Sequence, residues 1–303
     1  MKGEKSGEAF EALRDGVLGQ IEQNRSRLKR CHIIWTHRIV EKGFVKGRSG
    51  TLESLYELWF DSGKIAVKAR EQVWEQSDEG AWHARTTAFR SVFNGEDFRR
   101  QLKNEKEKSL INVYNDPSFL PYHNWFEVID WDGGGDLQAS REGVFDRFRT
   151  EGTIIADGER RLLRLRITNP KTNTGRETEY DLQRGGLLVC RKDFDTQGRI
   201  LVREERRLEE VQPGLWMPVW VQIAVLDPAS GKETLSHEYK VDLSKSEFGE
   251  QIAIPEGTFE VPITPDVVVI DTRAGDWAEY TGRSALMPLD ELRALVARRR
   301  VAE

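Results

Sequence analysis

At 303 residues, the chain is long enough for one large all-β domain or for two ordinary domains. Its net charge is −5 with both signs interspersed, which argues against a nucleic-acid partner because phosphate binding needs a net or local positive excess. No apolar run approaches the roughly 18 residues of a membrane span, and the N-terminal stretch shows no export signal. Cys31 and Cys190 leave a disulfide open, but two buried free thiols are favoured.

The N-terminal stretch predicts an amphipathic helix. Between Glu4 and Lys29, apolar residues recur mostly three or four positions apart, with charged residues between them. This helix has one apolar stripe to bury and leads directly into strands. We therefore expect it to cover one face of a sheet.

A succession of strands is predicted after the helix. Residues 31–40, 52–60, 65–74 and 82–93 place apolar residues on alternate positions, and Gly-rich or Asp-Ser-Gly turns lie between several of these segments. The Asn94-Gly95 dipeptide that closes the last of them is a strong hairpin signal. The first half of the chain is thus predicted to be an antiparallel meander.

The middle of the chain gives weaker signals. A short strand is expected at 109–114 and a short helix at 137–148, whereas the glycine-rich residues 132–136 must form a loop. We interpret the region from about 115 to 150 as an irregular insertion.

Regular strands are predicted again in the second half. They are expected at 153–156, 163–167, 177–182, 187–192, 199–211, 215–226 and 233–243. Short turns join nearly all of them, which favours an antiparallel sheet over parallel strands with crossover helices. The tail from Pro288 has acidic residues first and arginines last, as expected for a short terminal helix.

The strand at 215–226 differs from its neighbours. Its odd positions are all apolar and its even positions carry Trp216 and Trp220, so both of its faces are hydrophobic. The next strand, 233–243, alternates strictly and has one wet face. We therefore expect something to lie against the middle of the sheet, either a helix or a bound apolar molecule.

The order of several segments carries a resemblance. They are the N-terminal helix, the meander, Gly185–Val189, the turn at Gly198, Pro213–Pro218, Ile254–Val261 and Val267–Asp271. Over roughly residues 10–275, this order resembles the outer-membrane lipoprotein-sorting proteins, that is, the LolA/LolB-like family related to RseB. The chain departs from the family in having no N-terminal lipid-attachment cysteine.

The resemblance implies a mainly β fold with flanking helices. The sheet would be antiparallel and strongly curved, as a half or incomplete β-barrel, with the N-terminal amphipathic helix against one face. One such domain would span residues 1–275, with the insertion at about 115–150, and a tail with a short helix would occupy 276–303. A periplasmic location is implied, although the residues themselves leave a cytoplasmic one open.

The resemblance also implies a non-enzymatic protein that binds lipid or lipoprotein. Acyl chains would be buried against the concave apolar face of the sheet. The cavity candidates are Trp35, Tyr56, Leu58, Phe60, Phe89, Trp216 and Trp220. Each has a competing interpretation as a core residue, which is the commoner role of a large apolar side chain on a strand. The alternative function is a protein-interaction or envelope-sensor module on the same scaffold, without lipid.

No catalytic, cofactor or metal site is predicted. Sequence signatures of a nucleophile elbow, a phosphate loop and a dinucleotide site are absent, and no two histidines have the spacing of a metal pair. Asp130, Asp132 and Asp136 would suggest a calcium loop, but Arg141 stands where an EF-hand has its bidentate glutamate. A solvated surface loop is favoured there.

Overall fold

The computed structural model describes residues 4–103, 109–114 and 134–302. Its helices are α1 (Glu4–Ser26), α3 (Gly135–Arg141) and α4 (Leu289–Ala302). Its strands are β1 (Arg30–Lys42), β2 (Ser49–Asp61), β3 (Lys64–Gln76), β4 (Trp82–Phe93), β5 (Phe98–Lys103), β6 (Leu110–Tyr114), β7 (Arg149–Asp157), β8 (Arg160–Thr168), β9 (Gly175–Asp181), β10 (Leu187–Phe194), β11 (Ile200–Gln212), β12 (Leu215–Leu226), β13 (Glu233–Val241), β14 (Glu247–Phe248), β15 (Val268–Asp271) and β16 (Ala278–Tyr280).

The chain forms two compact units. Unit 1 comprises residues 1–28, 35–53 and 129–244, and unit 2 comprises residues 29–34, 54–128 and 245–303. Strands β1 and β2 contribute residues to both. The single domain over 1–275 stays a prediction.

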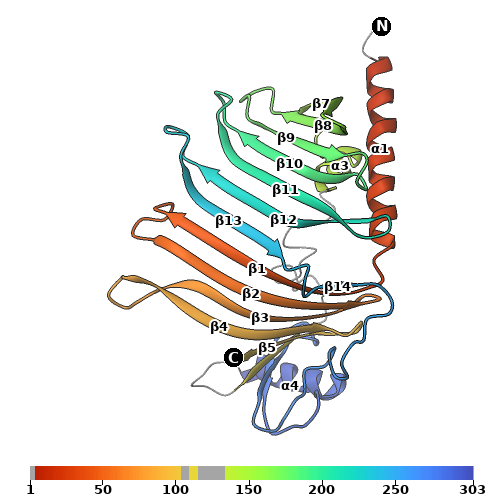
Figure 1. The fold of residues 1–303 in the computed structure, drawn as a ribbon. Coiled ribbons are helices and arrows are strands. Elements are labelled where there is room, and N and C mark those ends of the chain that lie inside the picture. Colours follow the sequence, from red (N-terminus) through yellow and green to blue (C-terminus); the bar gives the residue numbers. More distant parts are fainter. Residues whose placement is uncertain (1–3, 104–108, 115–133, 303) are drawn as a thin grey trace. The chain divides into compact units, whose positions relative to one another are not determined.

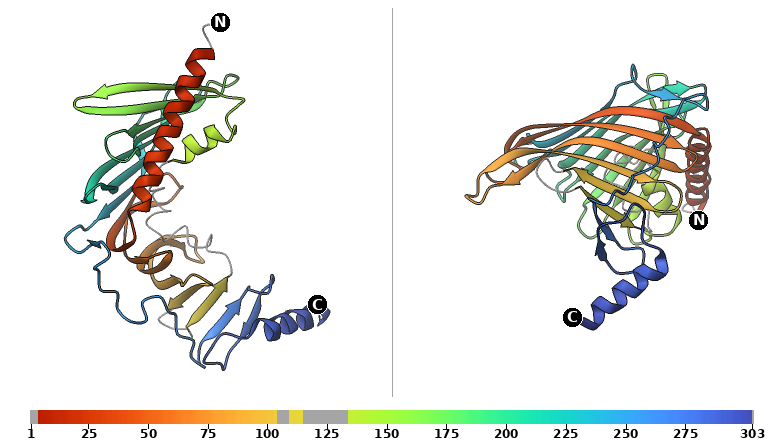
Figure 2. Two further views of the ribbon diagram at one scale, coloured as in Figure 1. Left: turned by 90° about the vertical axis from the view of Figure 1, so that its right-hand side faces the viewer. Right: turned by 90° about the horizontal axis from the view of Figure 1, so that it is seen from below.

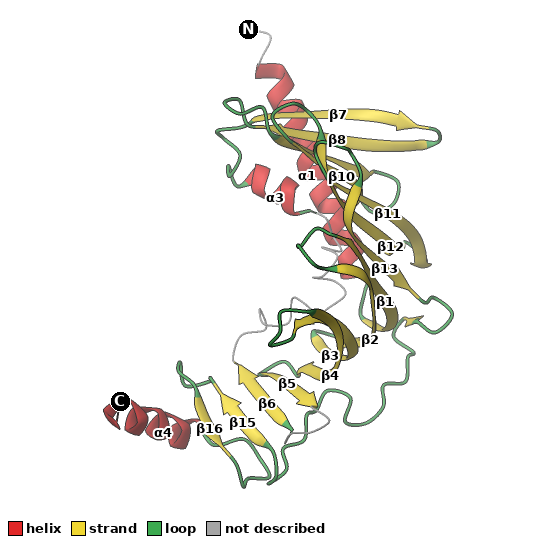
Figure 3. Ribbon diagram, turned by 90° about the vertical axis from the view of Figure 1, so that its left-hand side faces the viewer, coloured by secondary structure: helices red, strands yellow, loops and turns green. Residues whose placement is uncertain are grey.

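Unit 1 is built on antiparallel strands. Their order is β1-β13-β12-β11-β10-β9-β8-β7, and every neighbouring pair is antiparallel. Among the strands that the structure describes, β7 pairs only with β8, so the sheet is open at this edge. The longer strands twist and curve along their length (Figure 3). The predicted mainly β, antiparallel and open fold is confirmed.

Helix α1 runs across the strands of unit 1 (Figures 1 and 2). The spacing of its apolar residues directs Val17 and Ile21 onto the sheet, where they form one core with Leu165, Tyr180 and other residues. The predicted amphipathic helix against one face of the sheet is thereby confirmed.

Glycines let α1 approach the sheet closely. A methyl group on Gly152 of β7 would overlap the ring of Phe10. A methyl group on Gly186 would lie 3.0 Å from the carbonyl oxygen of Val17, and Gly186 also has a positive φ of +69°. Glycine therefore stands in β7 and in the turn before β10, where α1 passes close to them.

A β-bulge in β12 changes the expected pattern of faces. Pro218 pairs with Leu208, but Trp220 pairs with Arg207, so one extra residue of β12 lies between the two pairs. Leu208 and Arg207 are consecutive and face opposite sides of β11. The sequence placed Trp216 and Trp220 on one face, and this was wrong because the bulge reverses the alternation between them.

Strand β12 is nevertheless covered on both faces, as its sequence predicted. Met217 and Val221 lie on opposite faces because the bulge falls between them. They are 1% and 0% exposed. Apolar residues on both faces therefore correctly indicated a strand without a solvent-exposed face.

Unit 2 contains the strand order β2-β3-β4-β5-β6-β15-β16, with β14 paired to β1. The β6–β15 pair is parallel, whereas the sequence predicted antiparallel pairs throughout. The cause is the long coil between β14 and β15, which returns the chain so that β15 runs alongside β6 in the same direction (Figure 3).

The C-terminal elements share one core with this sheet. Val269 of β15, Tyr280 of β16 and Leu292 of α4 pack together with residues of β4 and β6. Asp271 is 0% exposed and accepts hydrogen bonds from the Tyr280 hydroxyl at 3.0 Å and from Arg273 Nη2 at 2.8 Å. The tail predicted for 276–303 therefore supplies a strand and a helix to unit 2, and its predicted terminal helix is present.

Candidate functional site

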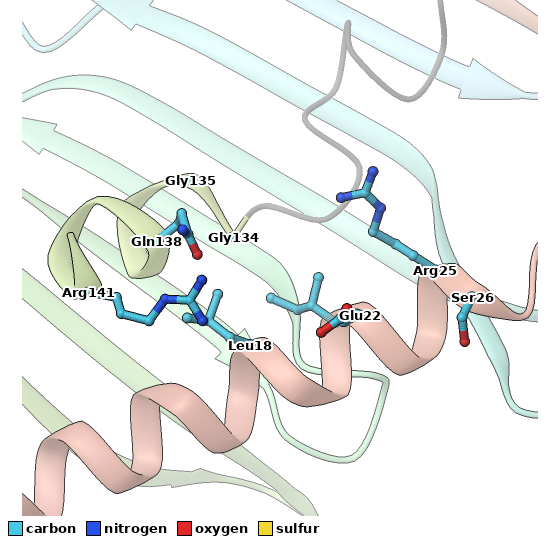
Figure 4. A pocket seen from close by; sticks show the side chains of 9 residues that line it. Leu18, Glu22, Arg25, Ser26, Gly134, Gly135, Gln138 and Arg141 are labelled. Carbon is cyan, nitrogen blue, oxygen red and sulfur yellow. The ribbon is translucent and has the colours of Figure 1, made fainter. Parts of the chain in front are cut away.

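An open pocket lies between α1 and α3 in unit 1. Its volume is about 670 Å³, and Leu18 and Ile21 of α1 form its apolar part. The other lining residues are Glu22, Arg25, Ser26, Gly134, Gly135, Gln138 and Arg141. Figure 4 shows the side chains of α3 reaching toward α1 across this space. We call it the α1–α3 pocket.

The sheet below these helices has one continuous face, which we call the helix face. Cross-strand partners define a row that begins under α1 and α3 and ends at β1. From β8 to β1 the row is Leu165, Thr178, Arg191, Glu204, Ile223, His237 and Ile39. Partners directly opposite one another share a face, so the helix face is apolar at Leu165, under α1, and mostly polar from Arg191 onward, with Asp136 of α3 paired to the polar part through Arg176.

The polar part of the helix face is an ionic ladder. Asp193 accepts hydrogen bonds from Arg176 Nε and Arg191 Nη2, both at 2.7 Å. Glu204 Oε1 lies 2.5 Å from Arg206 Nη2, and these two side chains are only 5% and 3% exposed. Burial raises the pKa of Asp193, but the hydrogen bonds from Arg191 and Arg176 outweigh it, so the pKa is lowered overall. The ladder therefore consists of mutually paired acidic and basic side chains.

A second polar cluster follows on β1 and β13. His37 Nε2 lies 3.0 Å from His237 Nδ1, and the His37 ring stacks on Tyr239 with centroids 4.1 Å apart. Burial and the nearby His237 lower the pKa of His37 to about 3. Burial also lowers the pKa of His237, against the opposing effect of Glu41. Burial and Glu204 raise the pKa of Tyr239 to about 12. Both imidazoles and the phenol are therefore neutral near pH 7.

Four of the predicted cavity residues lie together in unit 2. Tyr56 and Phe89 are both paired with Ala69 from opposite sides, so they share a face of the sheet with Leu58 and Phe60. Leu58 is 0% exposed and Phe60 is half-buried. The core formed with the C-terminal elements lies on the other face, at Ala66, the partner of Trp59.

The other three lie in unit 1. Trp35 is 1% exposed, and it pairs with Val241. Trp216 exchanges two backbone hydrogen bonds with the Asn24 amide of α1, at 2.8 and 2.9 Å, and Trp220 donates to Glu238. None of the seven predicted residues lines the α1–α3 pocket. Their role as a ligand site stays a prediction.

The pocket residues were missed because they lie on helices. An apolar stripe on a helix is usually interpreted as part of the hydrophobic core. The spacing of Leu18 and Ile21 does not show whether such a residue is covered by the sheet or lies at the edge of a pocket. The contact between His37 and His237 was missed because it depends on the register of β1 and β13, where Ile39 is the partner of His237.

Within the described residues, no group of three or more potential ligands is placed to hold a metal ion. Cys31 and Cys190 are both free thiols, and burial raises the pKa of Cys190 to about 11. None of α1, α3 and α4, the helices of the described chain, has the length and apolar character that a bilayer crossing requires. Asp130 and Asp132 lie outside the described residues. Asp136 lies in α3 and pairs with Arg176 at 3.0 Å.

No protein-family model and no curated protein matches the chain. Solved structures do match it. One is a DUF1329 family protein from Desulfovibrio piger, 11% identical with a TM-score of 0.44, covering 82% of this chain and 96% of its own. Another is a LolA superfamily protein from Nitrosomonas europaea, 9% identical with a TM-score of 0.41, covering 82% and 97%.

A third match is an outer-membrane lipoprotein-sorting protein domain, described as putative, from Vibrio parahaemolyticus. It is 12% identical with a TM-score of 0.41 and covers 80% of this chain and 95% of its own. The resemblance predicted from the sequence is thus confirmed as a resemblance: solved structures of LolA-like and lipoprotein-sorting type are among those to which this chain is similar.

Proposed function

We propose that the protein is a non-enzymatic carrier that binds the apolar chain of a lipid or lipoprotein in the α1–α3 pocket. The observation that carries this proposal is the pocket itself, which opens beside the apolar stripe of α1 and has a volume of about 670 Å³. Ligand pockets commonly measure about 300–1,000 Å³ and combine an apolar lining with a few polar groups. The resemblance to lipoprotein-sorting proteins adds a periplasmic location to the proposal.

The energetics suit reversible binding. Burial of an apolar chain contributes about 0.8 kcal/mol per methylene group, so a few methylenes against Leu18 and Ile21 give a measurable but modest affinity. The ionic ladder lies on the same helix face. An acyl chain there would have to displace paired charges, so the apolar end of the helix face is the favourable place for it.

The test is extraction of the purified protein with organic solvent, followed by mass spectrometry of the extract. Leu18→Glu places a carboxylate in the pocket and is expected to abolish lipid recovery. Loss of the apolar contact of one leucine costs about 1.5–3 kcal/mol, which is roughly ten- to a hundredfold in affinity. Gln23→Glu introduces the same group on an exposed position of α1 outside the pocket and should leave recovery unchanged.

If wild-type protein yields no lipid and binds no added amphiphile, the proposal is wrong. A stable complex with a protein in that case would favour the interaction-module alternative. Recovery of lipid from Leu18→Glu at the wild-type level would instead indicate that the binding site lies on another surface. The seven aromatic and aliphatic strand residues predicted from the sequence would then be the next candidates.

A further inference from the structure

A row of polar side chains crosses a largely apolar face of unit 2. Tyr56 and Phe89 lie on this face, which we call the aromatic face. Ser91 is two positions after Phe89 on β4, so its side chain points to the same face. Cross-strand pairing places Arg100 of β5 beside Ser91, and Asn112 of β6 beside Arg100. Three polar side chains thus lie next to one another on the aromatic face.

Arg100 has no counter-ion among the described residues. It forms no ion pair or hydrogen bond with them, and its guanidinium carbon lies 4.8 Å from the centroid of the Phe89 ring. Its neighbours along β5 and diagonally across on β4 and β6 are all uncharged: Phe98, Leu102, Phe89, Phe93, Leu110 and Tyr114. Apolar surroundings strengthen the attraction between charges, so an anion that reaches this guanidinium is held more tightly than it would be in water.

Two buried donors of the row also lack acceptors. Ser91 is 0% exposed, and in the described chain its Oγ has no hydrogen-bond partner. Arg100 Nε is likewise buried and without a partner there. Buried polar atoms are normally paired, and the Cβ atoms of directly opposite residues are about 4.5–5.5 Å apart. One ligand oxygen between these two side chains can therefore accept hydrogen bonds from both.

We propose that Ser91, Arg100 and Asn112 bind the carboxylate of an organic anion whose apolar part lies on the aromatic face. A guanidinium group binds a carboxylate through two parallel N–H donors, and the hydroxyl and amide add uncharged donors. One guanidinium balances the single charge of a carboxylate, whereas a phosphate monoester carries about −1.5 to −2 near neutral pH. All three residues belong to unit 2, so this site does not depend on lipid binding in the α1–α3 pocket of unit 1.

Amide exchange read by mass spectrometry tests the site where it lies. Purified, delipidated protein is titrated with dodecanoate, with dodecyl maltoside and with acetate, all below micelle-forming concentrations, and protection is followed in β4, β5 and β6. Dodecanoate should protect these strands at a lower concentration than the uncharged maltoside, which has the same chain. Acetate should bind more weakly than dodecanoate because it has no chain to lie on the aromatic face.

Two variants and a control identify the groups. Arg100→Gln and Ser91→Ala each remove a hydrogen bond to a charged group and should each weaken dodecanoate binding by about tenfold or more, without weakening maltoside binding. Ser91→Ala removes a buried hydroxyl that has no partner, so it should not accelerate exchange of β4 in the ligand-free protein. Arg70→Gln removes the same charge as Arg100→Gln from an exposed residue on the opposite face, where Arg70 pairs with Ala88, and should change neither binding.

Several results would overturn this site. Equal protection by dodecanoate and dodecyl maltoside, or wild-type affinity for dodecanoate in Arg100→Gln, would exclude recognition of the carboxylate. Acetate binding as tight as that of dodecanoate would show a plain anion site and exclude the apolar part of the ligand. No protection of β4, β5 and β6 by dodecanoate would exclude the site altogether, whereas lipid recovery from the α1–α3 pocket would still be decided by its own test.

Discussion

The contact between Phe10 and Gly152 allows the docking of α1 to be weakened by one methyl group. Gly152→Ala places that group inside the ring of Phe10. Overpacking of this kind costs about 1–3 kcal/mol, because either the ring or the helix has to move. By contrast, Gly16 and Gly19 lie inside α1 with nothing within 4 Å of an added methyl group. Alanine at each should stabilise the helix by about 1 kcal/mol.

Hydrogen exchange of the α1 amides is the appropriate assay. It reports the local opening of the helix, whereas a global melting curve of a protein with two units does not define one free energy. Gly152→Ala should accelerate exchange in α1 by roughly five- to a hundredfold, and the Gly16→Ala, Gly19→Ala pair should slow it by roughly tenfold or more.

The double variant Phe10→Ala, Gly152→Ala separates steric overlap from other effects. Removal of the ring makes room for the new methyl group, so Gly152→Ala should be almost without effect in the Phe10→Ala background. If Gly152→Ala leaves α1 exchange unchanged, or if it destabilises both backgrounds equally, then the close approach of α1 to β7 does not determine how the helix docks.

Three further predictions concern buried polar groups. Asp271→Asn removes the charge from a carboxylate that is 0% exposed and paired with its arginine, and should destabilise unit 2 by about 3–5 kcal/mol, measured as faster amide exchange in β15 and β16. Glu41→Gln breaks the buried carboxylate's bond to Arg48 at 2.6 Å and should similarly increase exchange around the β1–β2 turn, and unchanged protection would contradict the role of this pair. The pKa of His37 falls from 6.5 to about 3 on folding, so the unfolded chain binds the proton first and stability should decrease as the pH falls from about 6.5 toward 3. Amide exchange in β1 and β13 at about pH 7 and pH 5, corrected for the intrinsic exchange rates, should show a smaller change in protection in His37→Gln than in the wild type, and an equal change would exclude His37 as a source of the pH dependence.

The arrangement of elements could largely be predicted from the sequence. Alternation and turn residues indicated most of the strands, and the 215–226 strand was located with the bounds of β12. The short strands β5, β14 and β16 were missed. β5 has charged residues at three of its six positions, β14 has only two residues and β16 only three, so none of them shows a period.

The register of the strands and the position of the β-bulge could not be predicted from the alternation of apolar residues. Alternation assumes an uninterrupted strand, and the extra residue after Pro218 broke that assumption at the segment with the clearest pattern. Cross-strand partners such as Arg191 and Glu204 lie on different strands, so only the pairing of the sheet reveals the ionic ladder. The candidate pocket likewise depends on how α1 and α3 pack relative to each other, and this packing cannot be predicted from the sequence of either helix alone.

The parallel pairing of β6 with β15 has a consequence for biosynthesis. As the polypeptide leaves the ribosome or a translocation channel, β6 emerges long before its partner, and β1 likewise precedes β13. Such distant pairings close slowly and leave strand edges unprotected meanwhile. Nascent chains of this protein should therefore depend on a holding chaperone until almost all of the polypeptide has emerged.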